Sequence, residues 1–382
     1  MKTPIKILTI ISVLVFFAFT TKTSISEKKT VMTSNWKPDN VGIKVALLLD
    51  TSNSMDGLID QAKAQLWDIV NELSYAKYGG KNPNLSIALY EYGNDGLEVS
   101  DGYIRQVLDF SNDLDLISEK LFSLTTNGGS EYCGQVIQKS LNELRWGKNK
   151  QDLNLIFIAG NEAFTQGRIY YKDATANAKE KNVTVNTIFC GDYRSGVSEK
   201  WRDAALQTGG EYFAIDHNKE QIYVVTPYDA LIIQLNQELN DTYIYYGSRG
   251  YSKMKLQATQ DSNAAMLNEV VVVKRAVSKS SRIYNNATWD LVDASREKTF
   301  KYEDIDKKAL PKTLRNKSLK ELEIYVATQA KKRQEIQQKI NNLDKKRRVY
   351  IAKKQSETKK DNLENAMIST IKKQAQAKNY SW

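Results

Sequence analysis

Apolar runs of strand length alternate with amphipathic segments of helix length from Val41 to about residue 216. The apolar runs contain few charged residues and are expected to form strands at 41–49, 85–93, 103–110, 153–160, 183–191 and 210–216. The segments between them have apolar residues at helical spacing and are expected to form helices at about 57–76, 113–122, 131–146, 165–181 and 197–207. Strands that alternate with helices favour an α/β fold with a doubly wound, mostly parallel sheet covered on both faces.

The chain after this alternation has mostly helical spacing. A helix is expected from Thr226, with Pro227 at its first position, to about Glu238. The tyrosine-rich stretch 241–256 is expected to be a strand or an extended segment that packs on the sheet domain. The stretch 264–294 has the pattern of a helix-rich connector.

A long helix is expected to begin at Ser318, which forms a capping-box signature with Glu321. Apolar residues with polar interruptions then recur every three or four positions, as in a heptad seam: Leu319, Leu322, Val326, Gln329, Arg333, Ile336, Ile340, Leu343, Arg347 and Tyr350. A second amphipathic helix is expected at about 359–377. It would either pack back on the first helix as a hairpin or support self-association through a coiled coil.

The first 24 residues have the pattern of a secretory signal. Lys2 and Lys6 precede an apolar run over residues 7–19, and small and hydroxyl residues follow. The run is short for a membrane-spanning helix, but it lacks a clear A-x-A cleavage site, so an uncleaved anchor is the alternative. We therefore expect an exported protein that is periplasmic, secreted or membrane-anchored, in an oxidising compartment.

The positive charge of the chain belongs to its C-terminal part. The formal net charge is +10, and from Lys301 to the end there are 22 Lys and Arg against 10 Asp and Glu. Basic helices can neutralise phosphate on nucleic acid or lipid. For an exported protein we expect an anionic envelope lipid or polymer as the partner of this region and no nucleic acid. A solvated helix face is the simpler alternative.

The sequence offers little material for catalysis. It contains one histidine, His217, and two cysteines, Cys133 and Cys190. A multi-histidine metal site cannot be assembled from one histidine. His217 lies among charged residues and near no candidate site, so no Ser-His-Asp or Cys-His arrangement is expected. No P-loop or nucleophile-elbow signature is present. We therefore expect that the protein is not an enzyme.

The polar turn after the first strand is the strongest candidate for binding chemistry. In "DTSNS", Asp50, Ser52 and Ser54 place a carboxylate and two hydroxyls at the carboxyl end of a strand, where parallel sheets bind ligands. These hard oxygen atoms suit Mg²⁺, with Mn²⁺ or Ca²⁺ as alternatives. An ion with few carboxylate ligands can accept one more from a protein partner. The alternative is a hydrogen-bonded turn in which Asp50 caps the next helix.

The sequence "VALLLDTSNSM" on a first parallel strand resembles the metal-ion-dependent adhesion site of a von Willebrand factor A (VWA) domain. The likeness covers about residues 41–240 and is supported by "NGGS" before a helix. It implies a binding or adhesion module in which the three side chains above hold a divalent metal. A hydroxyl from a second loop completes such a site, and the matching residue here is Ser130, with Thr126 as the fallback.

The third loop departs from the family pattern. The resemblance implies an Asp at the end of the strand 153–160, but Gly160 stands there. Asn161, Glu162 or Glu131 could supply the missing oxygen through water. A structural envelope protein with a degenerate, metal-free site is therefore the alternative function.

Cys133 follows the second loop and Cys190 ends the strand 183–191, so both are expected at the same edge of the sheet. A disulfide between them would stabilise this edge, and two buried thiols are the alternative.

The expected organisation is a signal peptide, a polar linker, a VWA domain, a mixed connector and a basic helical or coiled-coil tail, at 1–24, 25–40, 41–240, 241–315 and 316–382. The expected function is an extracytoplasmic binding module whose metal engages a carboxylate on a protein partner, while the tail serves assembly or surface association.

Overall fold

The computed structural model of this chain describes three ranges of residues, 41–215, 224–358 and 363–382. The expected signal peptide at 1–24, the linker at 25–40 and His217 lie outside the described residues. The described residues form one compact unit. Within the described ranges, no helix is both long and apolar enough to cross a bilayer.

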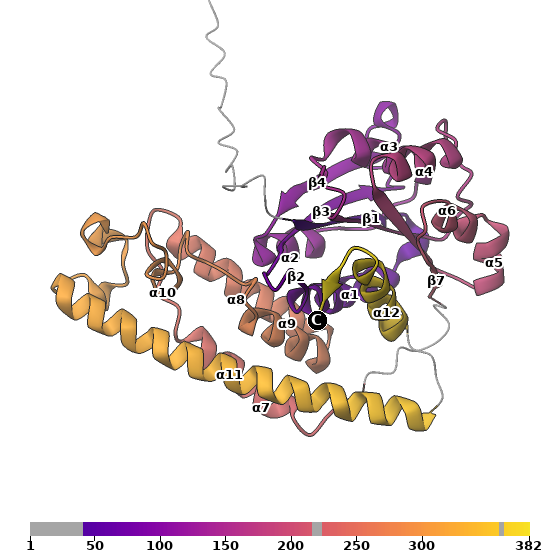
Figure 1. Ribbon diagram of the computed structural model, residues 1–382. Helices are drawn as coiled ribbons and strands as arrows, with labels where there is room; N and C mark the ends of the chain where they lie inside the picture. The colour runs from indigo at the N-terminus through magenta and orange to yellow at the C-terminus, as the bar shows by residue number, and fades with distance from the viewer. Residues whose placement is uncertain (1–40, 216–223, 359–362) are drawn as a thin grey trace, which may run out of the picture. The chain divides into compact units, whose positions relative to one another are not determined.

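A six-stranded sheet with the order β4-β3-β1-β5-β6-β7 organises the first half of this unit (Figure 1). Its strands are β1 (Gly42–Asp50), β3 (Asn84–Tyr92), β4 (Ile104–Ser111), β5 (Leu153–Gly160), β6 (Val183–Phe189) and β7 (Tyr212–Ala214). All neighbouring strands are parallel except β4, which runs antiparallel to β3. The expected fold class, a mostly parallel sheet followed by a helical C-terminal region, is confirmed.

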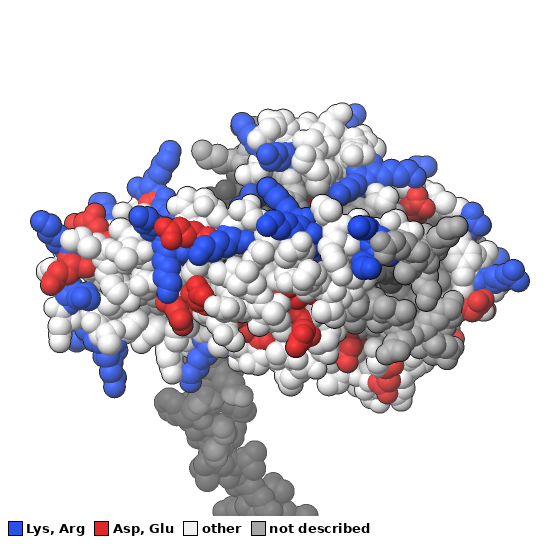
Figure 2. Space-filling model, turned by 90° about the horizontal axis from the view of Figure 1, so that it is seen from below, with Lys and Arg blue, Asp and Glu red and all other residues white. Residues whose placement is uncertain are grey.

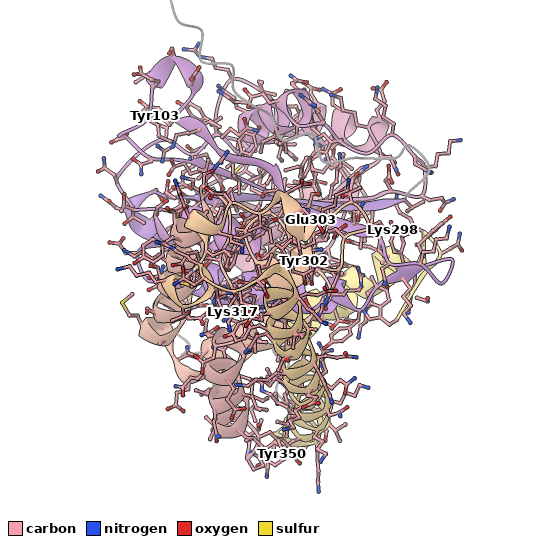
Figure 3. All side chains as sticks on the ribbon, turned by 90° about the vertical axis from the view of Figure 1, so that its left-hand side faces the viewer. Tyr103, Lys298, Tyr302, Glu303, Lys317 and Tyr350 are labelled. Carbon is pink, nitrogen blue, oxygen red and sulfur yellow. The ribbon has the colours of Figure 1, made fainter. Side chains whose placement is uncertain are left out.

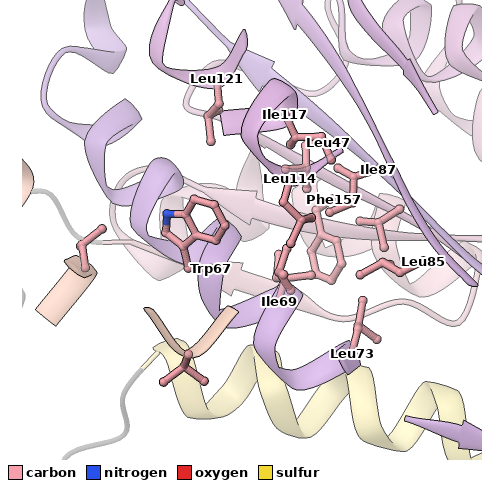
Figure 4. Close-up of a cluster of buried hydrophobic side chains, with 14 of the residues drawn as sticks. Leu47, Trp67, Ile69, Leu73, Leu85, Ile87, Leu114, Ile117, Leu121 and Phe157 are labelled. Atoms are coloured by element: carbon pink, nitrogen blue, oxygen red, sulfur yellow. The ribbon is translucent and has the colours of Figure 1, made fainter. Parts of the chain in front are cut away.

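Helices cover both faces of the sheet because its strands are apolar on both sides. Along β1, Val45 and Leu47 belong to one hydrophobic core, while Ala46 and Leu48 belong to the other. One face carries α1 (Leu58–Ser74) and α2 (Leu114–Phe122), and the other carries α3 (Cys133–Glu143), α4 (Tyr171–Glu180) and α6 (Trp201–Gln207), with α5 (Tyr193–Ser198) beside α6. Figure 4 shows Trp67, Ile69 and Leu73 of α1 directed toward side chains of the sheet and α2.

The C-terminal half consists mainly of helices. They are α7 (Asp229–Asn240), α8 (Gly250–Leu267), α9 (Glu269–Ser280), α10 (Leu291–Ala294), α11 (Leu319–Thr358) and α12 (Leu363–Gln376). Short 3₁₀ turns lie at Asn53–Met55, Val99–Asp101, Tyr302–Asp304, Lys307–Ala309 and Lys312–Leu314. The expectation of a strand or extended segment over 241–256 is wrong from Gly250 onward, where α8 begins; only Tyr245 forms an isolated bridge, with Asp290.

The apolar stripe of α11 packs within the chain. Leu322, Val326, Ile336 and Ile340 are all buried, on the side that contacts α7, α9 and α10. The polar interruption Arg333 is also fully buried among acidic side chains. The prediction of a coiled-coil seam along α11 was wrong, because its apolar stripe forms a core within the chain. Figure 3 shows Tyr302 near the start of α11 and Tyr350 near its other end.

The end of the chain returns to the sheet domain. Met367, Ile371 and Ala375 of α12 are buried in the same core as α1, which α12 contacts directly. Beyond α12, the short strand β8 (Tyr380–Ser381) pairs with β2 (Lys77–Tyr78), and the buried Tyr380 hydroxyl donates to main-chain oxygens at the edge of the sheet. Instead of a hairpin with α11, α12 therefore forms part of the layer that covers the sheet.

A buried ion network joins α8 and α9 to α2. Arg275 Nη2 lies 2.8 Å from Asp115 Oδ1, and Asp261 accepts from Arg275 at 2.5 Å and from Lys279 at 2.7 Å. Burial alone would raise the pKa of Asp261, but the Lys279 ammonium and the Arg275 guanidinium hold it well below its usual range. The ionised Asp261 therefore stabilises the folded state at neutral pH.

Acid is expected to weaken this network. Because the pKa of Asp261 is lower in the folded state, its contribution to stability is present above the unfolded-state pKa of about 3.9 and is lost as the pH falls below it. Urea unfolding between pH 3 and 7 should therefore show a smaller pH dependence for Asp261→Asn than for the unsubstituted protein. The exposed Asp241→Asn serves as the control, and equal slopes in both variants would contradict the expectation.

Candidate metal centre

Strand β1 ends at Asp50, and the turn after it brings the three predicted oxygen side chains together. Asp50 Oδ1 accepts a hydrogen bond from the Ser52 main-chain nitrogen at 2.7 Å, which folds the turn back on the carboxylate. Ser52 Oγ lies 2.9 Å from Ser54 Oγ. Asp50 and Ser52 are buried, whereas Ser54 is exposed. The turn thus has an inner carboxylate and an outer hydroxyl.

The second loop, residues 124–132, is tied to this turn through its main chain. The Asn127 nitrogen donates to the Thr51 oxygen at 2.9 Å, and Asn94 Nδ2 donates to the Thr125 oxygen at 3.0 Å. Ser130 is half-buried and directly precedes the buried Glu131. Thr126, the fallback hydroxyl, donates instead to Asp56, which is exposed.

The third loop has no room for the aspartate that the resemblance implies. A Cβ on Gly160 would lie 2.5 Å from the Tyr92 hydroxyl and 3.0 Å from the ring of Trp201, both of which are fully buried. The neighbouring Asn161 accepts a hydrogen bond from Ser54 Oγ at 3.1 Å, so it joins the site from the third loop. Glu162 is exposed and accepts from Gln166 at 3.2 Å.

Glu131 is one of the three residues that the sequence offered for the missing oxygen, and the structure places it beside Asp50. A Cβ placed on Gly93 would lie 2.7 Å from Asp50 Oδ1 and 2.9 Å from Glu131 Cγ, so the carboxylate of Asp50 and the side chain of Glu131 flank one point. Asp50 Oδ2 and Glu131 Oε2 are buried without a hydrogen-bond partner among the described residues. The signal for Glu131 was its place in a glycine-rich loop directly before a helix.

Burial raises the pKa of both carboxyl groups. Burial, with the hydrogen bond and the negative charge of Asp50, raises the pKa of Glu131 to about 9. Burial also raises the pKa of Asp50, although the hydrogen bonds from Glu131 and Ser52 act in the opposite direction. A cation between the two groups would remove the cost of burying two negative charges side by side.

The donor set fits a hard divalent cation. It consists of carboxylate and hydroxyl oxygens, which Mg²⁺, Mn²⁺ and Ca²⁺ prefer, and it includes two buried oxygens that lack a partner. Over the three described ranges, no cluster of three or more His, Cys, Asp or Glu side chains could hold a metal. The ion would therefore depend on the serine hydroxyls as well as on Asp50 and Glu131.

The expected disulfide is absent, and the structure gives the reason. Cys133 and Cys190 are both buried free thiols. Cys133 lies in the core on the α3 side of the sheet, whereas Cys190 lies in the core on the α1 side. The two residues do share one edge of the sheet, but their side chains belong to opposite faces, and the prediction of a disulfide bond was wrong.

Comparison with known protein families matches part of the chain. Residues 44–226 match the family described as von Willebrand factor type A domain, and this part of the chain is a VWA domain. Such domains often mediate protein binding through a divalent metal at this site. A search of curated proteins found no match.

Solved structures with a similar fold were also found. A conserved hypothetical protein, BatB from Bacteroides thetaiotaomicron, is 16% identical with a TM-score of 0.35, over 46% of this chain and 91% of its own. Proximal thread matrix protein 1 from the mussel byssus, solved with zinc in its MIDAS motif, is 13% identical with a TM-score of 0.36. That match covers 47% of this chain and 43% of the mussel protein, so this chain spans less than half of its length.

Proposed function

We propose that this protein is an extracytoplasmic binding module that uses a divalent cation to engage an acidic group on a protein partner. Asp50, Ser52 and Ser54 would hold the ion, with Ser130 supplied by the second loop. The observation that carries the proposal is the convergence of the first three side chains beside the unpartnered buried Oδ2 of Asp50, within the described part of the chain.

The cation would supply a positive charge that attracts a carboxylate. The chain's own residues lie at two depths in the site and have different roles. Asp50 is anchored inside by the Ser52 nitrogen, whereas Ser54 lies exposed at the rim, where Asn161 orients it. A partner's acid would therefore approach from the side of Ser54 and Asn161. Catalysis is not part of the proposal.

The C-terminal helices would serve surface association. Exposed basic residues follow the outer side of α11, among them Lys331, Lys332, Lys339, Lys345 and Lys346. Figure 2 shows basic side chains along one face of the molecule, with acidic ones between them. Such a face suits an anionic envelope lipid or polymer. Export of the protein belongs to the same proposal, and no nucleic acid is expected as a partner.

Removal of Asp50 tests the metal site. Titration calorimetry with Mn²⁺ and Mg²⁺ should detect one ion per unsubstituted chain, and Asp50→Asn should weaken binding about 100-fold or more. Even side chains that only orient a ligand change metal affinity about 10–100-fold. Asp56→Asn is the matched control, since Asp56 is an exposed carboxylate near the turn that bonds to Thr126. Absence of binding to the unsubstituted protein would refute the proposal.

A metal-free structural protein is the second candidate. The observation in its favour is that the Tyr92 hydroxyl lies 2.5 Å from where a Gly160 Cβ would be, so the aspartate of the third loop cannot be accommodated. Ser54 is also already hydrogen-bonded to Asn161. The same titration decides between the two functions, because a purely structural protein would bind neither ion and would engage its partners equally well in EDTA.

A further inference from the structure

We propose that Glu131 is the second carboxylate ligand of the metal centre, in place of the acid that is missing at position 160. This inference rests on the proposed function and assigns the residue that completes the same site. It starts from the two buried carboxylate oxygens, Asp50 Oδ2 and Glu131 Oε2, that have no hydrogen-bond partner within the described ranges. Buried polar oxygens are almost always satisfied, so this pair indicates a missing positive group.

Position 160 at the start of the third loop is closed to an acidic side chain. Tyr92 is fully buried, and its hydroxyl donates to the Ala159 oxygen at 2.9 Å. That hydroxyl, together with the ring of Trp201, fills the space that a side chain on Gly160 would need. An aspartate at this position would have to displace two packed aromatic residues. The carboxylate must therefore come from elsewhere in the chain.

The fold brings Glu131 to this place through Gly93. Gly93 has a φ of +78° and no side chain, and its absent Cβ leaves the space in which Asp50 Oδ1 and Glu131 Cγ approach the same point. The second loop is fixed there by close main-chain packing, because a Cβ on Gly129 would lie 2.5 Å from the Gly93 oxygen. Glu131 is thus held against Asp50 by the backbone of two loops.

The other acidic or amide residues near the site do not meet the same conditions. Glu162 is exposed, and its carboxylate already accepts a hydrogen bond from Gln166. The Asn161 amide is neutral and exchanges two hydrogen bonds with Ser54, at 3.1 Å and 3.4 Å. Glu131 combines burial, contact with Asp50 and an unpartnered oxygen over the described part of the chain. Two carboxylates would balance the charge of a divalent ion inside the protein.

Manganese titration of the full chain tests the assignment. Glu131→Gln keeps the size of the side chain and its capacity for hydrogen bonds but removes the charge. We expect it to weaken Mn²⁺ binding about 10-fold or more, whereas the control Glu180→Gln, at an exposed residue that ends α4, should change the affinity by less than about twofold. Crystals of the unsubstituted protein with Mn²⁺ should give an anomalous peak at about 2.0–2.3 Å from a Glu131 carboxylate oxygen.

The outcomes separate the two levels of the proposal. Loss of Mn²⁺ binding in Asp50→Asn with unchanged affinity in Glu131→Gln would overturn the role of Glu131 and leave the metal site standing. Absence of Mn²⁺ binding to the unsubstituted chain would overturn both. If Glu131→Gln fails to fold, the anomalous peak decides: a peak bound to Asp50 but distant from Glu131 refutes the assignment.

Discussion

Replacement of Arg333 by alanine is expected to lower the free energy of unfolding by about 3–5 kcal/mol, because it removes one member of a buried ion network. The Arg333 guanidinium lies 2.6 Å from Asp290 Oδ2 and 2.9 Å from Asp293 Oδ1. It also donates to the hydroxyl and the main-chain oxygen of Thr242, and it stacks 4.0 Å from the centre of the Tyr243 ring. Alanine would leave Asp290 buried without its cation.

Urea denaturation followed by circular dichroism measures this effect. Arg296→Ala is a suitable control, since Arg296 also pairs with Asp293, at 3.9 Å, but its side chain is 48% exposed. Exposed pairs contribute about 0–1 kcal/mol. Losses of similar size in the two variants would mean that the Arg333 network does not hold α11 against the rest of the chain.

Installing the family's aspartate by Gly160→Asp is expected to destabilise the protein and to weaken metal binding rather than restore it. Excess volume in a packed core costs about 1–3 kcal/mol, and a Cβ at this position would lie 2.5 Å from the Tyr92 hydroxyl. A displaced Tyr92 would also disturb Asp50, whose Cβ is 3.3 Å from the same point. Thermal unfolding and Mn²⁺ titration measure the two effects.

Two further variants isolate the steric cause. Gly160→Ala adds only the Cβ, and the matched Gly42→Ala adds one to a strand residue where the nearest atom is 3.7 Å away. We expect a clear loss of stability in the first and little change in the second. Combining Gly160→Asp with Tyr92→Phe removes the overlapping oxygen, so the double variant should lose less stability than the sum of the single ones. Strict additivity would indicate another cause.

Much of the sheet domain could be predicted from local patterns. The apolar runs that became β1 and β5 are buried on both faces, and such runs alternate with amphipathic helices only in parallel α/β sheets. The turn after β1 was recognisable for the same reason. Asp50, Ser52 and Ser54 are neighbours in sequence, so a short turn suffices to bring them together.

The helical half was harder to predict because its partners are distant in sequence. The stripe of α11 was found by its spacing, but spacing does not reveal that Arg333 meets Asp290 within the same chain rather than a second copy. The tyrosines at 243, 245 and 246 favoured a strand by propensity. A helix, α8, begins instead at Gly250 and packs against α2 and α9.

By itself, the sequence determined the sheet, its covering helices and the oxygen-rich turn, since periodicity and short loops are local properties. Only the tertiary structure decided what lies beside that turn. It placed Tyr92 and Trp201 where an aspartate was expected, brought Glu131 against Asp50 across the missing side chain of Gly93, and put the two cysteines on opposite faces of the sheet. These outcomes depend on which side of the sheet each crossover takes and on which loops meet at its edge. Such contacts join residues far apart in the chain, and no local pattern encodes them.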